Sequence, residues 1–331
     1  MARIPIGKVV GEAYAFAFGR YLTVLSVVWL PLLLLCAAAF FSIVPFFGVF
    51  LQMMHEAARH AASGDTSGPV YSPETLQTLM RMRGLNFLFN LAQLAFFAIV
   101  TVGITKEALG LRTGFRPVYI SWGRDELLVA GAFFLVFVLL IIFIIVAAIV
   151  GGIVGGVGAV AIHGSSGSWI SGGVGAGLLV ALLVLIAMCV LIYLAVRLMF
   201  FVVPITVAER EFGVFRSWEL SKGQFWPIFA ILFLSWVPAA VAIDIVWSAA
   251  FWFLAFPPIM SAIKGFQAHD PAAAAAVVDQ IVISVKANWP WLLALYLIPL
   301  PVMNGLMFSP AAFAYRELKP AEAAATASSP A

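Results

Sequence analysis

Charged residues are scarce in this sequence of 331 residues, and their scarcity excludes a soluble globular protein. Lysine and arginine number 18 and aspartate and glutamate 15, so that 10% of the chain is charged. A soluble domain carries roughly 25% charged residues. Hydrophobic residues make up 64%, more than a soluble fold of this size can bury, because its surface grows nearly as fast as its volume. The composition therefore predicts an integral membrane protein.

Cysteine and clustered metal ligands are also nearly lacking. Cys36 and Cys189 both lie inside apolar runs, where a cysteine usually packs as a small hydrophobic residue. The segment from His55 to His60 reads HExxxH, one residue longer than the HExxH spacing of zinc-binding helices. We expect neither a metal nor a cofactor. The net charge of +3 is too small to indicate a nucleic-acid partner.

Long apolar runs, in contrast, are abundant. A bilayer core is about 30 Å thick, so that a spanning helix needs roughly 20 apolar residues. Six such runs occur, at about residues 22–50, 85–105, 127–150, 178–203, 226–256 and 291–313. Ser72-Pro73 and Asp270-Pro271 each place a capping residue before a proline, a pattern typical of a helix start. We predict an all-α, polytopic membrane protein with six transmembrane helices.

The basic residues predict the orientation of these helices. Six spans place both termini on one side. That side carries twelve basic residues: Arg3, Lys8, Arg20, Lys106, Arg112, Arg116, Arg124, Arg210, Arg216, Lys222, Arg316 and Lys319. The opposite side carries five: Arg59, Arg81, Arg83, Lys264 and Lys286. Because cytoplasmic loops are enriched in lysine and arginine, both termini are expected in the cytoplasm.

A repeated pattern marks the ends of the even-numbered spans. The segment from Pro204 to Phe212 matches the segment from Pro310 to Leu318, with the same proline-to-arginine distance and Arg-Glu-apolar at the end. Lys106 and Glu107 end the second span in a looser version of this pattern. We interpret the chain as three two-helix repeats, although inner span ends in general share aromatic and basic flanks.

The odd-numbered spans also begin alike, each with a glycine just before the membrane and an aromatic, amphipathic stretch before that. The aromatic or apolar faces contain Val10, Tyr14, Phe18 and Tyr21 in the first; Val118, Tyr119 and Trp122 in the second; and Phe212, Phe215 and Trp218 in the third. Such segments are predicted to form cytoplasmic interfacial amphipathic helices. The approximate repeats are residues 1–110, 111–212 and 213–318, in a single membrane domain of residues 1–318. The tail, residues 319–331, is expected to be disordered.

The segment from Phe215 to Trp226, FRSWELSKGQFW, carries a resemblance. Its serine, leucine, Lys-Gly and aromatic residues before a span are similar to those of a broad group of bacterial six-span membrane proteins. That group includes the membrane domain of some glycerophosphodiester phosphodiesterases, and related stand-alone proteins of unknown function. The resemblance implies a location in the bacterial inner membrane and a six-span fold. It implies no activity, because no soluble stretch is long enough for the phosphodiesterase catalytic domain.

Two ionisable residues fall within the predicted spans. Asp244 lies in the outer half of the fifth span, and a charged group at membrane depth is costly enough to be a functional candidate. The alternative is a hydrated position near the exported interface. Arg197 lies about two turns from the cytoplasmic end of the fourth span. We expect its long stem to reach phosphate headgroups, in preference to a role in substrate binding.

Basic residues at the inner ends of the spans are candidate contacts for lipid headgroups: Arg20, Arg124, Arg210, Arg216, Lys222 and Arg316. Membrane lipids are thus the expected partners, with other membrane proteins as a second class. We predict a protein without catalytic activity, acting as a scaffold, accessory subunit or organiser of the bilayer. A transporter or flippase for a lipid or small apolar molecule is the alternative. A lipid-headgroup enzyme would have to rely on Glu107, Glu209, Glu211 and nearby arginines, which look like repeat boundaries.

Overall fold

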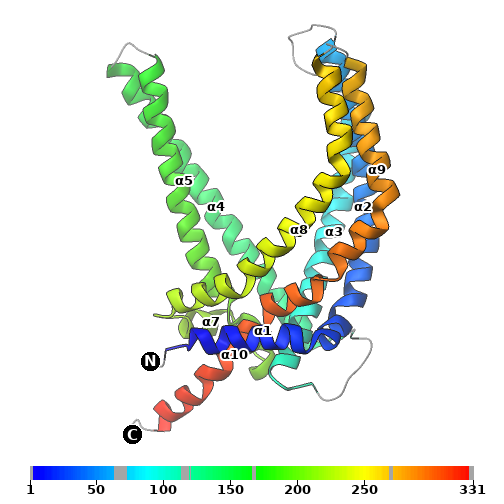
Figure 1. Ribbon diagram of the computed structural model, residues 1–331. Helices are drawn as coiled ribbons and strands as arrows, with labels where there is room; N and C mark the ends of the chain where they lie inside the picture. The colour runs from blue at the N-terminus through cyan, green and yellow to red at the C-terminus, as the bar shows by residue number, and fades with distance from the viewer. Residues whose placement is uncertain are drawn as a thin grey trace.

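The protein folds as a set of long α-helices (Figure 1). The computed structural model describes residues 3–62, 73–112, 119, 121–165, 169–267 and 271–327. Within these ranges there is no strand, and the helices are α1 (Ile6–Gly19), α2 (Tyr21–Ala62), α3 (Pro73–Ala108), α4 (Arg124–Ser165), α5 (Trp169–Met199), α6 (Val202–Glu209), α7 (Val214–Leu220), α8 (Phe225–Gln267), α9 (Pro271–Leu297) and α10 (Leu300–Ala327). Helices satisfy their own backbone hydrogen bonds, as a chain in lipid must. The predicted all-α fold is confirmed.

Six stretches are long and apolar enough to cross a membrane, as predicted. They are Tyr21–Phe41, Gly84–Ala108, Arg124–Ile149, Val184–Glu209, Phe225–Phe253 and Lys286–Lys319. Each overlaps one of the six apolar runs of the sequence. The chain is therefore built as a multi-pass membrane protein.

The long helices form three hairpins of consecutive helices. In Figure 1, α2 runs beside α3, α4 beside α5, and α8 beside α9, and each pair is in contact. The connecting residues 63–72, 166–168 and 268–270 lie outside the described ranges. The helices α3 and α9 begin at Pro73 and Pro271, as the capping patterns predicted. Three hairpins are compatible with three repeats, but the repeat itself stays a prediction.

The buried core gathers at one end of the molecule, which we call the base: the end where α1, α7 and the first half of α10 lie (Figure 1). Its largest cluster includes Val9 and Phe16 of α1, Val27 of α2, Ile104 of α3, Phe201, Ile205 of α6, Ile228 of α8 and Leu306 of α10. Val196 of α5 belongs to the same cluster, so α1, α2, α3, α5, α6, α8 and α10 meet there. The base is what holds the three hairpins in one structure.

Away from the base, the hairpins diverge. Figure 1 shows the α4–α5 hairpin as one arm, and the α2–α3 and α8–α9 hairpins together as the other. Of the most apolar 18-residue stretch within Arg124–Ile149, only 11% is buried inside the protein. Large apolar side chains exposed on the α4–α5 arm include Phe134, Phe137, Ile142, Ile145, Leu182, Val184 and Leu185. Such a surface is stable only against lipid or another apolar surface.

Two of the spans are broken at the base. The fourth is divided between α5 and α6 at Phe200–Phe201, and the sixth between α9 and α10 at Ile298–Pro299. Pro299 and Pro301 explain the second break, because proline has no N–H to donate to the carbonyl four residues earlier. The second span, α3, runs without a break to Ala108. The three even-numbered spans therefore differ in backbone geometry.

Tyr14 of α1 and Tyr21 of α2 donate hydrogen bonds to backbone carbonyls of α8 and of the α9–α10 break. The Tyr14 hydroxyl donates to the Leu234 carbonyl over 3.1 Å. Leu234 lies four residues before Pro238, which cannot donate to that carbonyl. The Tyr21 hydroxyl donates to the Ile298 carbonyl over 3.0 Å, at the α9–α10 break. These bonds fix α1 and the start of α2 against the irregular parts of α8 and α9–α10.

Two of the three stretches expected to form interfacial helices are helical, and their location at the membrane interface stays a prediction. The first stretch contains α1 and the third contains α7, whereas residues 113–118 and 120 of the second lie outside the described ranges. The buried face of α1 carries Val9, Ala13, Phe16 and Ala17, one position away from the predicted face of Val10, Tyr14 and Phe18. The reason is α10, which packs against that side of α1. Phe18 remains 60% exposed.

The C-terminal tail differs from the prediction. Disorder was expected for residues 319–331, but α10 continues to Ala327. The segment from Ala321 to Ala327 reads AEAAATA. Alanine is the strongest helix former and glutamate is a good one, so a helix already begun at Leu300 extends through this segment.

Candidate functional site

A cavity of about 610 Å³ lies between α8, the end of α9 and the start of α10. One face of α8 supplies most of its wall, because residues three or four apart share a helical face. The lining residues are Trp236, Val237, Ala240, Val241, Ile243, Asp244, Trp247, Leu295, Tyr296 and Met303. The wall is thus mainly apolar, with three aromatic side chains and one carboxylate.

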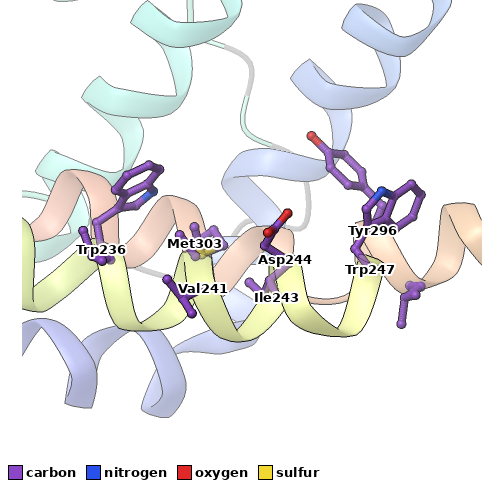
Figure 2. A pocket seen from close by; sticks show the side chains of 10 residues that line it. Trp236, Val241, Ile243, Asp244, Trp247, Tyr296 and Met303 are labelled. Carbon is purple, nitrogen blue, oxygen red and sulfur yellow. The ribbon is translucent and has the colours of Figure 1, made fainter. Parts of the chain in front are cut away.

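Among those lining residues, only Asp244 and the phenol of Tyr296 can ionise. Figure 2 shows its carboxylate between Trp236 on one side and the pair Trp247 and Tyr296 on the other. The rings of that pair meet edge to face, with centroids 6.1 Å apart. The Asp244 side chain is exposed. The carboxylate thus lines a cavity and is accessible from outside, and both sequence interpretations of Asp244 stay predictions.

The second candidate, Arg197, lies at the base and not in this cavity. Its guanidinium contacts the short helix α7: Nη2 donates to the Trp218 carbonyl over 2.8 Å, and Nε donates to the Ser221 hydroxyl over 3.2 Å. Nη1 donates to the Tyr193 hydroxyl over 2.9 Å. The guanidinium carbon lies 3.7 Å from the centre of the Trp218 ring, a cation–π contact.

This arrangement changes the interpretation of Arg197. The residue is 7% exposed and its donors are used by protein acceptors, whereas we expected it to reach lipid phosphates. In the part of the chain that the structure describes, no carboxylate forms an ion pair with Arg197, and Asp244 is no exception. Arg197 instead fastens α5 to α7. Arginine suits this role because its planar group stacks and donates several hydrogen bonds at once.

The six basic residues proposed as headgroup contacts fall into two groups. Three form ion pairs with carboxylates of other elements: Arg20 with Glu107 at 2.9 Å, Arg216 with Glu209 at 2.9 Å, and Arg316 with Glu12 at 2.7 Å. Among the described residues, Arg124, Arg210 and Lys222 have no carboxylate within ion-pair distance. The latter three are accordingly the stronger candidates for binding anionic headgroups.

The basic-acidic pairs that end the second and sixth spans have matching contacts. Lys106 pairs with Asp125 at 2.7 Å, and its neighbour Glu107 pairs with Arg20. Arg316 pairs with Glu12, and its neighbour Glu317 pairs with Lys8 at 2.8 Å. Lys106 and Glu107 thus join α3 to α4 and to the end of α1, whereas Arg316 and Glu317 both join α10 to α1. Because these side chains are partly exposed, each bridge contributes at most about 1 kcal/mol.

A fully buried carboxylate opens α4. Glu126 is 1% exposed and accepts hydrogen bonds from the Gly123 N–H over 2.9 Å and from the Tyr119 hydroxyl over 3.0 Å. A glutamate three residues after the helix cap often reaches back in this way. Lys106 lies 3.5 Å away and balances its charge. Burial, together with the negative charge of Glu126, raises the pKa of Tyr119.

In the described ranges, no group of three or more histidine, cysteine, aspartate or glutamate side chains is placed to hold a metal ion. Comparison with known proteins gave no match to a family model, to a curated protein or to a solved structure. The site must therefore be interpreted from its own geometry.

The sequence pointed to Asp244 but not to its surroundings. Trp236 and Trp247 share a helical face with Asp244, and that spacing is visible in the sequence. Tyr296 lies more than 50 positions away, and only the fold brings it near. The structural role of Ser217 and Ser221 was not predicted either, because nothing in their local sequence shows that they form hydrogen bonds with Arg197.

Proposed function

We propose that this chain is a non-catalytic bacterial inner-membrane protein that organises lipids around separated helical hairpins, with both termini in the cytoplasm. The observation that carries the proposal is the position of the core. Among the residues whose side chains the structure describes, nearly all the buried ones lie at the base, and the described parts of the hairpins beyond it expose large apolar side chains. Lipid chains would fill the space that a compact bundle closes by direct helix packing.

The charges at the base support the same role. Arg124, Arg210 and Lys222 lie next to the beginnings or ends of spans and have no carboxylate partner among the described residues. Anionic lipids attract such residues by roughly 1 kcal/mol each near the membrane surface. The base would then hold headgroups, and the arms would hold acyl chains. In the proposed organisation each hairpin is one of three repeats, entered through a helix near the cytoplasmic interface.

The test is a count of motionally restricted lipids. Spin-labelled phosphatidylcholine in vesicles containing the purified protein distinguishes lipids held at the protein from bulk lipids. The proposal predicts more restricted lipids per protein than the perimeter of a compact six-helix bundle accommodates. It also predicts that phosphatidylglycerol is held more strongly than phosphatidylcholine, and that this preference falls when Arg124, Arg210 and Lys222 are changed to glutamine. A restricted-lipid count equal to that of a compact bundle would refute it.

The cavity favours one alternative, a transporter or flippase. A carboxylate inside an apolar cavity beside a broken helix is typical of transport sites in membranes. Vesicles with fluorescent lipid in both leaflets test this directly, because an impermeant quencher reaches inner-leaflet lipid only if the protein moves it. Protein-dependent loss of the protected fluorescence, abolished by Asp244→Asn, would support transport. Full protection of inner-leaflet lipid would leave the organising role as the better account.

A further inference from the structure

We propose that the cavity at Asp244 binds an amphipathic ammonium compound, with its cationic head at the Asp244 carboxylate and its apolar chain along α8 and the α9–α10 break. This site does not depend on the lipid-organising role, which rests on the base and the outer surfaces of the arms. The argument uses the charge, the rings, the apolar wall and the size of the cavity.

The charge of the cavity selects a cation. Asp244 is an acceptor, and no lysine, arginine or histidine is among the described residues that line the cavity. A ligand with a phosphate would place a second negative charge beside Asp244 with no cation from these residues to balance it, and like charges repel. A ligand with a single positive charge and no anionic group is the best complement.

The rings select the kind of cation. Trp236 lies to one side of the carboxylate, and Trp247 and Tyr296 lie to the other (Figure 2). The faces of aromatic rings attract cations, and tryptophan does so best. Aromatic side chains combined with a carboxylate are a recurrent way to bind quaternary ammonium groups. A metal ion, in contrast, would need several oxygen or nitrogen ligands, and the lining provides one carboxylate.

The backbone beside the cavity adds a hydrogen-bond acceptor. Leu295 lines the cavity and lies four residues before Pro299, which has no N–H to donate to the Leu295 carbonyl. The break between α9 and α10 thus leaves acceptor capacity at Leu295, a residue of the same cavity wall as Asp244. This feature again favours a ligand that is positively charged or donates hydrogen bonds.

The remaining wall fits an alkyl chain. Val237, Val241 and Met303 contribute apolar surface, and Val241 and Met303 lie between Trp236 and Asp244 in Figure 2. A cavity of about 610 Å³ lies within the range of small-molecule sites, roughly 300–1,000 Å³. The cationic head and the first part of an alkyl chain would be enclosed, and the rest of the chain would reach lipid.

Binding of dodecyltrimethylammonium tests the proposal. The full chain is placed in nanodiscs of phosphatidylcholine, and radiolabelled dodecyltrimethylammonium bound beyond that in empty nanodiscs is measured. We expect saturable binding that uncharged dodecanol does not compete for at equal membrane concentration. Asp244→Asn should weaken this binding at least about tenfold, since it removes the ion pair with little change of shape.

Three further variants keep the result interpretable. Asp244→Glu retains the charge and should retain most of the binding. Tyr296→Leu keeps the wall apolar but removes one ring, and it should weaken binding several-fold. Glu219→Gln, a loss of the same charge on the exposed surface of α7, should bind as the unchanged protein does. Equal affinity of the Asp244→Asn variant, or equal competition by dodecanol, would overturn the proposal, provided that the variant unfolds at the same temperature as the unchanged protein.

Discussion

The hydroxyl of Ser217 lies between the backbone N–H of Phe201 and the backbone carbonyl of Arg197. It accepts from the N–H over 3.2 Å and donates to the carbonyl over 3.1 Å. In an uninterrupted α-helix these two backbone groups would bond to each other, since they are four residues apart. A side chain of α7 is therefore inserted into the hydrogen-bond ladder of the fourth span, a recognised cause of helix breaks.

Ser217→Ala tests this insertion. The change leaves the Phe201 N–H without its partner, and the Arg197 carbonyl keeps only the hydroxyl of Ser221 as a donor. An unsatisfied buried group costs about 1–3 kcal/mol. We expect a clear fall in the thermal unfolding midpoint in detergent, and loosening of the junction between α5 and α6. Ser248→Ala in α8 is the matched control and should change the midpoint little. If the two variants unfold alike, the inserted hydroxyl contributes nothing to stability.

Arg197→Lys separates a structural role from a headgroup contact. Lysine cannot keep the bonds to Tyr193, Trp218 and Ser221 together with the stacking on Trp218, so we expect a loss of about 1–3 kcal/mol. The loss should be the same in nanodiscs of phosphatidylcholine and of phosphatidylglycerol, because the guanidinium contacts protein. A loss that appears only with phosphatidylglycerol would restore the headgroup interpretation.

Gly103→Ala tests the close approach of α2 and α3. A methyl group at position 103 would lie 2.5 Å from Cγ1 of Val27 and 2.9 Å from the Tyr119 ring. Relieving this overlap should cost about 1–3 kcal/mol. Gly84→Ala, in the same helix, meets nothing within 4 Å, and it should stabilise α3 by roughly 0.5–1 kcal/mol. Opposite signs in the two unfolding midpoints are expected, and a shift of the same sign would contradict the packing.

The raised pKa of Tyr119 predicts a loss of stability in alkali. The folded protein holds the phenolic proton more tightly than the unfolded chain does. The stabilisation is therefore complete below the unfolded pKa of about 10 and is lost as the pH rises above it. Unfolding midpoints measured from pH 8 to pH 11 should fall more steeply above pH 10 for the unchanged protein than for Tyr119→Phe. Parallel curves would show that Tyr119 ionises as it does in the unfolded chain.

The sequence predicted the spans well, because hydrophobicity along the chain directly reports lipid contact. Pro73 and Pro271 also marked two helix starts, since a capping residue before proline is a local signal. The helices nevertheless extend past the apolar runs, as α2 does to Ala62. Local composition does not show where a helix already begun will end.

The sequence could not predict contacts between distant residues. Tyr14 and Tyr21 were assigned to an aromatic face for the membrane interface, but their hydroxyls bond to carbonyls more than 200 positions away. Arg197 was assigned to headgroups because its buried partners in α7 cannot be inferred from spacing. Arg20, Arg316 and Arg124 were all predicted to contact headgroups. Only the fold decides which of them form ion pairs with carboxylates.

The central claim is that the hairpins meet at the base and stay apart elsewhere. Spin labels at Leu185 of α5 and Phe253 of α8, both exposed, report it after Cys36 and Cys189 are replaced by alanine. Their separation is measured by pulsed electron–electron double resonance in nanodiscs. The structure predicts a distribution centred far beyond the roughly 10 Å between the axes of packed helices. A short, narrow distribution, as in a closed six-helix bundle, would contradict it.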